Sequence, residues 1–258
     1  MDMLVAKNYL VNLLSPATLQ KLRKLGSPIV SRLFAHNLPA LAIIAGTDKW
    51  GAHWYAQHYQ NHFAPLRRQR LNILEIGVGG FADPTAGGAS LRMWKSFFPR
   101  ALIHAVDIVD KTALQEPRIK IFQGSQDDPD FLRGVVREMG TVDIIIDDGS
   151  HRNEHVLKSF EILFPLLAEN GIYAIEDMQT SYWQNYGGTS KEFNDRRTSM
   201  GYFKSLIDGL NHDEYLIRDY GPTYLDRNIV SMHFYHNLAF IYKGRNQEGS
   251  VNKPAIRE

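Results

Sequence analysis

The sequence has 258 residues, of which 44% are hydrophobic and 22% charged, and its formal net charge is +1. This ordinary globular composition gives no indication of a nucleic-acid or polyanion partner. There is no cysteine, which excludes disulfides, thiolate metal ligands and a cysteine nucleophile. No apolar run approaches the roughly 20 residues of a membrane span, so we expect a cytoplasmic protein.

The sequence divides into a helical N-terminal extension over 1–45, a main domain over 46–245 and a polar tail over 246–258. Six apolar leucines in the extension are candidates for a dimer interface or a substrate lid, and we favour a homodimer. These residues are Leu4, Leu10, Leu13, Leu14, Leu19 and Leu22.

The main domain alternates predicted strands and helices. Short apolar runs predict strands over 71–77, 102–107, 119–124, 142–148, 171–177, 229–235 and 238–243. Helices are predicted over 90–98, 129–139 and 156–167. This alternation indicates an α/β protein with a doubly wound parallel sheet. The last two strands predict an antiparallel hairpin, which is typical of class I methyltransferases and unusual for a dinucleotide-binding fold.

A glycine-rich turn follows the first predicted strand, in the segment Glu75-Ile76-Gly77-Val78-Gly79-Gly80. Position 82 is Ala, so the third glycine of the dinucleotide-binding pattern is missing. The acidic residue before Gly77 instead resembles motif I of the class I S-adenosylmethionine (SAM) methyltransferases. Asp107 is placed to bind the ribose hydroxyls, and Gln126 and Asp127 lie where such enzymes hold the adenine. An acid after the second strand serves NAD equally well, so an NAD-dependent oxidoreductase is an alternative, as is a turn without a ligand.

Carboxylates end two consecutive predicted strands. Asp147 and Asp148 end the fourth strand, shortly before His151, and Glu176 and Asp177 end the fifth. Neighbouring strands lie about 5 Å apart, so these side chains can converge on one hard divalent cation such as Mg²⁺. Such a cation can chelate a vicinal diol, and His151 is the candidate general base because imidazole titrates near neutral pH. We expect Asp147 to cap the following helix or orient a neighbour.

Several segments together resemble the metal-dependent sugar O-methyltransferases, a family with macrocin, mycinamicin and rhamnosyl O-methyltransferases and mycobacterial enzymes that methylate polysaccharide sugars. The segments are Gly46–Trp50, Leu74–Gly80, Ser90–Trp94, Asp147–His151, Glu176-Asp177 and Thr180–Trp183. The likeness covers about 46–188. It implies a Rossmann-like class I SAM methyltransferase sheet with a C-terminal antiparallel hairpin. The small helical N-terminal extension over 1–45 lies outside the likeness.

The resemblance also implies roles for individual residues. It assigns Mg²⁺ or Mn²⁺ to Asp148, Glu176 and Asp177, and proton removal to His151. The expected SAM-binding residues are Thr47, Lys49, Glu75, Gly77, Gly79, Asp107, Gln126 and Asp127. Tyr182, Trp183 and Tyr186 are expected either to stack on a sugar or to pack their loop onto the core.

The expected function is SAM- and Mg²⁺-dependent O-methylation of a sugar hydroxyl in a glycoside, oligosaccharide or secondary metabolite. The metal would chelate adjacent hydroxyls of the sugar, and a histidine would act as the general base. The alternatives are methylation of a catechol or another non-sugar diol, the NAD-dependent oxidoreductase, and a catalytically silent cofactor-binding protein.

Overall fold

The computed structural model describes residue 18 and residues 28–250. Most of the predicted helical extension lies outside this range, and so do all six of its apolar leucines. Residues 251–258 of the predicted tail also lie outside it. The described part of the extension contains α3 (Pro28–Leu33) and α4 (Leu38–Ala45). No helix among the described residues is long and apolar enough to cross a membrane.

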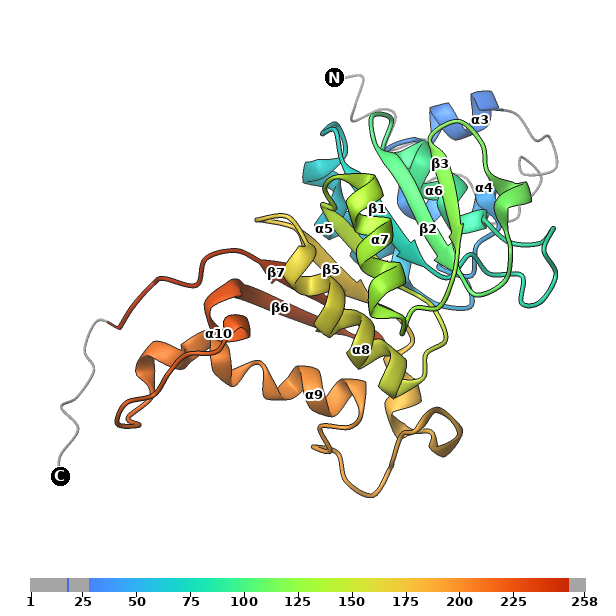
Figure 1. The fold of residues 1–258 in the computed structure, drawn as a ribbon. Helices are drawn as coiled ribbons and strands as arrows, with labels where there is room; N and C mark the ends of the chain where they lie inside the picture. Colours follow the sequence, from blue (N-terminus) through green and yellow to red (C-terminus); the bar gives the residue numbers. More distant parts are fainter. Residues whose placement is uncertain (1–17, 19–27, 251–258) are drawn as a thin grey trace. The chain divides into compact units, whose positions relative to one another are not determined.

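A seven-stranded sheet with strand order β3-β2-β1-β4-β5-β7-β6 confirms the predicted fold class (Figure 1). The strands are β1 (Asn72–Ile76), β2 (Leu102–Asp107), β3 (Ile119–Gln123), β4 (Ile144–Asp147), β5 (Ile172–Ile175), β6 (Ile229–Tyr235) and β7 (Leu238–Lys243). The chain divides into two compact units. The first comprises the residues up to Leu71 with Val78–Ala105 and Val109–Gln123, and the second comprises Asn72–Gly77, Val106–Ile108 and the chain from Gly124 onward. The domain boundaries expected from the sequence stay predictions.

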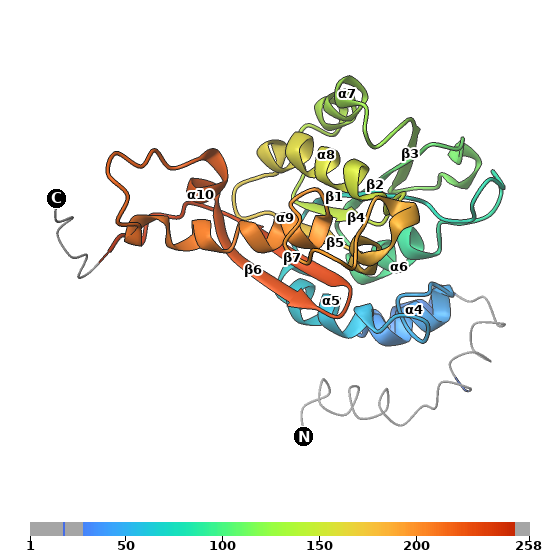
Figure 2. The same ribbon diagram turned by 90° about the horizontal axis from the view of Figure 1, so that it is seen from below.

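In the second unit, β1, β4 and β5 are parallel, and β7 pairs antiparallel with both β5 and β6. The three isoleucines of β4 are fully buried, as expected for a strand covered on both faces. Helices α7 (Pro129–Met139) and α8 (Asn153–Leu163) lie on the same face of β1 and β4 (Figure 2). The Asp128 side chain caps α7 by accepting from two backbone N–H groups, and Pro129 occupies the first helical position.

The C-terminal end of α8 continues into η3 (Phe164–Leu166) and is held by a buried lysine. Lys243 Nζ donates to the carbonyls of Phe164, Pro165 and Leu167 at 3.2, 2.9 and 2.6 Å. A cation at this end satisfies carbonyls that have no partner within the helix and complements the helix dipole. The lysine thus ties β7 to the end of α8.

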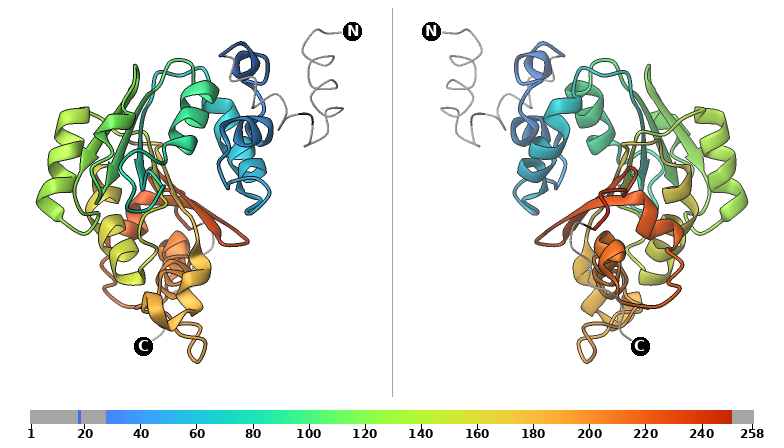
Figure 3. Two further views of the ribbon diagram at one scale, coloured as in Figure 1. Left: turned by 90° about the vertical axis from the view of Figure 1, so that its right-hand side faces the viewer. Right: turned by 90° about the vertical axis from the view of Figure 1, so that its left-hand side faces the viewer.

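The segment between β5 and β6 forms short helices that the sequence analysis did not predict. They are η4 (Met178–Tyr182), η5 (Gln184–Tyr186), α9 (Ser199–Ser205), η6 (Asp208–Glu214) and α10 (Tyr224–Asn228). Helix α9 packs against α8 and η4, while η6 and α10 lie beside β6 (Figure 3). Asn246, expected in the polar tail, donates its side-chain amide to the carbonyl of Asp226 at 2.9 Å, so this position is anchored to α10.

The first unit packs α4, α5 (Tyr55–Phe63), η1 (Ala64–Leu66), α6 (Ala89–Phe97) and η2 (Thr112–Leu114) with β3 and most of β2. Its core is aromatic: the Tyr59 ring lies 4.9 Å from Trp94 and 5.0 Å from Phe63, measured between ring centroids, and all three side chains are fully buried. Edge-on and tilted contacts of this kind favour a rigid core. Gly46 ends α4 in the left-handed conformation (φ 77°), which is the usual use of glycine at a helix end.

Candidate active site

The carboxyl ends of β1 to β5 form a row that is fixed by backbone hydrogen bonds. These bonds run from Gly77 N to Val106 O, Gly124 N to Asp107 O, Asp148 N to Ile76 O and Glu176 N to Asp147 O, at 2.8–3.0 Å. Ligands of open α/β sheets bind at this edge. The predicted site residues that follow these strands in the second unit are therefore gathered where the sequence analysis expected them.

Gly77 makes this close approach of neighbouring strand ends feasible. Its φ is +94°, and a Cβ added there would overlap the carbonyl oxygen of Asp148 and lie 2.9 Å from its carbonyl carbon. Any larger side chain would therefore displace Asp148. The glycine after β1 controls the position of a predicted metal ligand as well as the shape of the turn.

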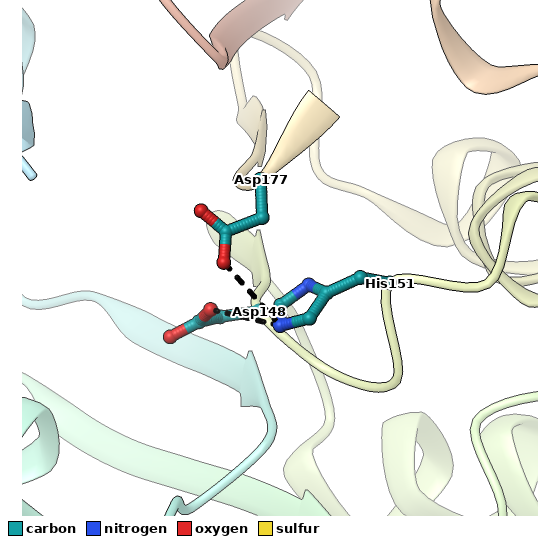
Figure 4. A group of neighbouring side chains, drawn as sticks. All are labelled: Asp148, His151 and Asp177. Carbon is teal, nitrogen blue, oxygen red and sulfur yellow. Dashed lines mark ion pairs between the residues drawn. The ribbon is translucent and has the colours of Figure 1, made fainter. Parts of the chain in front are cut away.

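Asp148, His151 and Asp177 converge at the ends of β4 and β5 (Figure 4). His151 Nε2 lies 3.5 Å from Asp177 Oδ2 and 4.0 Å from Asp148 Oδ1. The three side chains are partly exposed, at 24%, 18% and 24% for His151, Asp177 and Asp148, so a ligand can reach them. His151 (φ 55°) and Asp177 (φ 52°) both adopt the left-handed conformation, which costs non-glycine residues roughly 1–2 kcal/mol each. Such strain persists where the surrounding structure enforces it, often at functional sites.

The donor set fits the expected metal. Asp148 and Asp177 offer carboxylate oxygens, which Mg²⁺ and Mn²⁺ prefer, and one ligand atom from each of Asp148, His151 and Asp177 lies within 4.8 Å of the other two. Glu176 is not a member of this group and is 3% exposed. Its role as a third carboxylate ligand stays a prediction, as does the role of His151 as base.

Asp147 belongs to a buried polar cluster. Its carboxylate accepts hydrogen bonds from Ser159 Oγ at 2.6 Å, Gln126 Nε2 at 3.2 Å and the Tyr173 hydroxyl at 3.4 Å. Burial raises the pKa of Asp147 to about 6, although the hydrogen bond from Ser159, the charge of His151 and the hydrogen bond from Gln126 partly oppose that rise. The residue orients its neighbours, in line with the expectation from the sequence.

Gln126 and Asp127, which follow β3, make hydrogen bonds and ion pairs with other residues of the protein. Gln126 Oε1 accepts from Ser150 N at 2.7 Å, so its amide holds the loop that carries His151. A hydrogen bond from Ser125 lowers the pKa of Asp127, and Asp127 Oδ2 also lies 3.9 Å from Lys158 Nζ. The contacts of Gln126 and Asp127 with adenine stay predictions.

Three of the predicted SAM-binding residues, Thr47, Lys49 and Gly79, lie in the first unit. Thr47 Oγ1 accepts from Lys49 N at 3.3 Å, and the Lys49 side chain is fully buried. Gly79 has φ +76°, and a Cβ there would meet no atom within 4 Å, which leaves room for a ligand to approach the backbone. Glu75, in the second unit, is fully buried. SAM binding by these residues stays a prediction.

The glycine-rich loop that contains Gly79 is fixed by a lysine that the sequence analysis missed. Lys111 is fully buried, and its Nζ donates to the carbonyls of Phe81 at 2.9 Å, Asp83 at 2.5 Å and Ala86 at 3.1 Å. A single ammonium therefore satisfies three carbonyls of one loop. A lysine in an irregular segment carries no sequence signal for this role.

The aromatic loop, residues 178–190, begins directly after Asp177. Tyr182 and Trp183 are 37% and 49% exposed, and the Trp183 and Tyr186 rings lie 5.9 Å apart. Phe193, which the sequence analysis did not single out, is 59% exposed and lies 6.1 Å from Tyr182. Exposed aromatic rings next to a polar cluster are suited to stacking on a sugar, and contact with a sugar stays a prediction.

No protein-family model matches the sequence. The chain is 51% identical over 208 residues to mycinamicin VI 2''-O-methyltransferase from Micromonospora griseorubida, a match that covers 80% of this chain and 52% of that protein. It is 47% identical over 235 residues to 8-demethyl-8-alpha-L-rhamnosyl tetracenomycin-C 2'-O-methyltransferase from Streptomyces olivaceus, covering 88% of this chain and 62% of that protein. The chain thus spans about half to three fifths of the length of these curated relatives.

The chain is also similar to a solved methyltransferase structure. The MycE methyltransferase from the mycinamycin biosynthetic pathway, in complex with Mg and SAH, matches with a TM-score of 0.81 and 49% identity, covering 84% of this chain and 55% of that one. Another MycE structure also contains mycinamycin VI. Over four fifths of its length, this chain is a homologue of the sugar O-methyltransferases and has the class I SAM methyltransferase fold.

Proposed function

We propose that this chain is a SAM- and divalent-metal-dependent O-methyltransferase that acts on a sugar hydroxyl. The observation that carries the proposal is the convergence of Asp148, His151 and Asp177 at the sheet edge. It occurs in a chain about half identical to enzymes whose names specify methyl transfer to a sugar position. The proposed occupants of the site are SAM, Mg²⁺ or Mn²⁺, and a sugar-bearing acceptor.

In this proposal each residue has a separate task. A bound Mg²⁺ would supply charge that lowers the pKa of a coordinated hydroxyl. Asp148 and Asp177 hold the cation, and Glu176 is the proposed third carboxylate. His151 Nε2 accepts the hydroxyl proton, while the oxygen forms a bond to the methyl carbon of SAM and the bond from that carbon to sulfur breaks. The products are the methyl ether, S-adenosylhomocysteine and a protonated His151.

The aromatic loop provides the proposed acceptor surface. Tyr182, Trp183 and Tyr186 present rings that would stack on the apolar face of a sugar, and Phe193 extends that surface. Positioning of the acceptor hydroxyl against the methyl group would supply much of the rate. A catechol has the same pair of adjacent oxygens, so it is the competing acceptor.

The test is transfer of labelled methyl from SAM to a panel of mycinamicin VI, L-rhamnosyl glycosides, hexose oligosaccharides and catechols, with the product identified by mass spectrometry and NMR. Labelling of one sugar hydroxyl is the expected result. Labelling of catechols alone would replace the sugar by a non-sugar diol. Binding of NAD without binding of S-adenosylhomocysteine would refute the proposal.

The homodimer and the cytoplasmic location expected from the sequence are kept as proposals. Light scattering of the purified chain tests the first, and a monomeric mass would end it.

A further inference from the structure

Asn153 is a buried residue at the start of α8 whose side-chain amide both donates and accepts hydrogen bonds. It is 1% exposed and lies two residues after His151. Its Nδ2 donates to Thr180 O at 3.1 Å and to Tyr186 O at 2.9 Å, and its Oδ1 accepts from Ser199 N at 2.7 Å. One side chain thus joins α8 to η4, to the last residue of η5 and to the start of α9.

The contact with Thr180 leads directly back to the candidate metal site. Thr180 donates to the carbonyl oxygen of Asp177 through its backbone N at 3.2 Å and through its Oγ1 at 3.0 Å. Asn153 therefore links the segment that carries His151 to the segment that carries Asp177. The two segments come from different strands, and Asn153 fixes their separation by side-chain hydrogen bonds.

A second contact holds the same loop to α9. Ser181 Oγ lies 2.7 Å from Ser199 Oγ and accepts from Met200 N at 2.9 Å. The loop is thus anchored at Ser181 independently of Asn153, and loss of Asn153 should loosen the loop without releasing α9 entirely.

We infer that Asn153 is a positioning residue that sets the aromatic loop relative to the Asp148–His151–Asp177 group and so determines affinity for the acceptor. The inference about the acceptor rests on the proposed function, whereas the inference about loop position does not. Asn153 acts on the loop through its hydrogen bonds to the carbonyls of Thr180 and Tyr186.

The chemistry of the amide separates this role from ordinary helix stabilisation. Asn153→Asp keeps the acceptor for Ser199 N but replaces the NH₂ group by a carboxylate oxygen, which would face the carbonyls of Thr180 and Tyr186 without a proton to share. A carboxylate in the first turn favours a helix. If Asn153 only stabilised α8, burial of the new carboxylate would lower the stability of the Asp variant without faster exchange in 178–190. If Asn153 positions the loop, the Asp variant should show faster exchange there, like Asn153→Ala.

Asn246→Ala is a matched control. Asn246 is a half-buried asparagine in the same unit whose Nδ2 also donates to backbone carbonyls, those of Asp226 at 2.9 Å and Leu210 at 3.1 Å. It belongs to neither the aromatic loop nor the candidate metal site. Its removal should lower stability without affecting the loop.

The experiment uses the full chain and the Asn153→Asp, Asn153→Ala and Asn246→Ala variants, each first checked for cooperative thermal unfolding. Hydrogen exchange is measured for peptides covering 178–190, S-adenosylhomocysteine binding is measured by calorimetry, and KM and kcat are measured with the glycoside that the wild-type chain methylates best. We expect faster exchange in 178–190 in both Asn153 variants only. We also expect an acceptor KM about tenfold higher or more, with little change in S-adenosylhomocysteine affinity.

Two results would overturn the inference. One is exchange in 178–190 that matches the Asn246→Ala control in both Asn153 variants. The other is an equal loss of acceptor and S-adenosylhomocysteine affinity, which would indicate general loosening. If the wild-type chain methylates no glycoside, the proposed function fails, and the exchange data still decide whether Asn153 positions the loop.

Discussion

Gly77→Ala should damage both stability and metal binding because of what surrounds this glycine. Its φ of +94° costs an alanine roughly 1–2 kcal/mol. The new Cβ would also overlap the carbonyl of Asp148, and overpacking of this kind typically costs about 1–3 kcal/mol. For a domain of this size each kcal/mol lowers the unfolding temperature by about 2–4 °C, so we expect a fall of roughly 4–20 °C.

Gly79→Ala is the matched control. It has a similar φ of +76°, but its added Cβ would meet no atom within 4 Å, so only the conformational cost applies and the expected fall is about 2–8 °C. Because Gly77→Ala must shift Asp148, it should also weaken Mg²⁺ binding by about tenfold or more, whereas Gly79→Ala should leave Mg²⁺ binding unchanged.

Circular dichroism during thermal unfolding measures the first effect, and calorimetric titration with MgCl₂ measures the second. Equal unfolding temperatures for the two variants would refute the steric argument. A Gly77→Ala chain that binds Mg²⁺ like the wild type would show that Asp148 has not moved or does not bind the metal.

Three further substitutions test individual residues. His151→Ala should lower methyl transfer by about 10²–10⁴-fold with S-adenosylhomocysteine binding intact, and normal turnover would remove His151 as the base. Asp148→Asn should raise the Mg²⁺ concentration needed for half-maximal transfer, and an unchanged titration would exclude Asp148 from the ligands. Lys111→Met leaves three loop carbonyls without their donor and should lower the free energy of unfolding by about 2–3 kcal/mol, measured by urea denaturation; an unchanged midpoint would show that the loop does not depend on this lysine.

The sequence was informative wherever local pattern determines structure. The predicted strands over 102–107, 229–235 and 238–243 and the helix over 129–139 have the observed bounds. Apolar β-branched runs identify buried strands, and Asp128-Pro129 identifies the start of α7. Helix α8 begins at Asn153, before the predicted start at Val156. No side chain caps its N-terminus, so the sequence carries no capping signal for this start.

The part that could not be predicted depends on contacts between distant residues. The segment between β5 and β6 consists of short helices and turns without a clear periodicity. Asn153 and Lys111 act through hydrogen bonds to backbone carbonyls more than 20 residues away along the chain. Such bonds leave no repeating pattern in the sequence, so these residues become visible only once the chain is folded.

The candidate site lies between these two cases. Acids at the ends of consecutive parallel strands must come close together, so Asp148 and Asp177 could be predicted to converge. The turn that brings His151 Nε2 to 3.5 Å from Asp177 depends on the left-handed backbone of both residues. Neither is a glycine, and the sequence gives no sign of that conformation.

The most direct test of the central claim is the metal dependence of methyl transfer by this chain. Transfer from labelled SAM to an L-rhamnosyl glycoside should be measured with MgCl₂, after addition of a chelator, and after restoring excess MgCl₂. The account predicts labelled sugar that disappears with the chelator and returns with Mg²⁺. Labelling that continues undiminished in the chelator would contradict a metal held by Asp148 and Asp177.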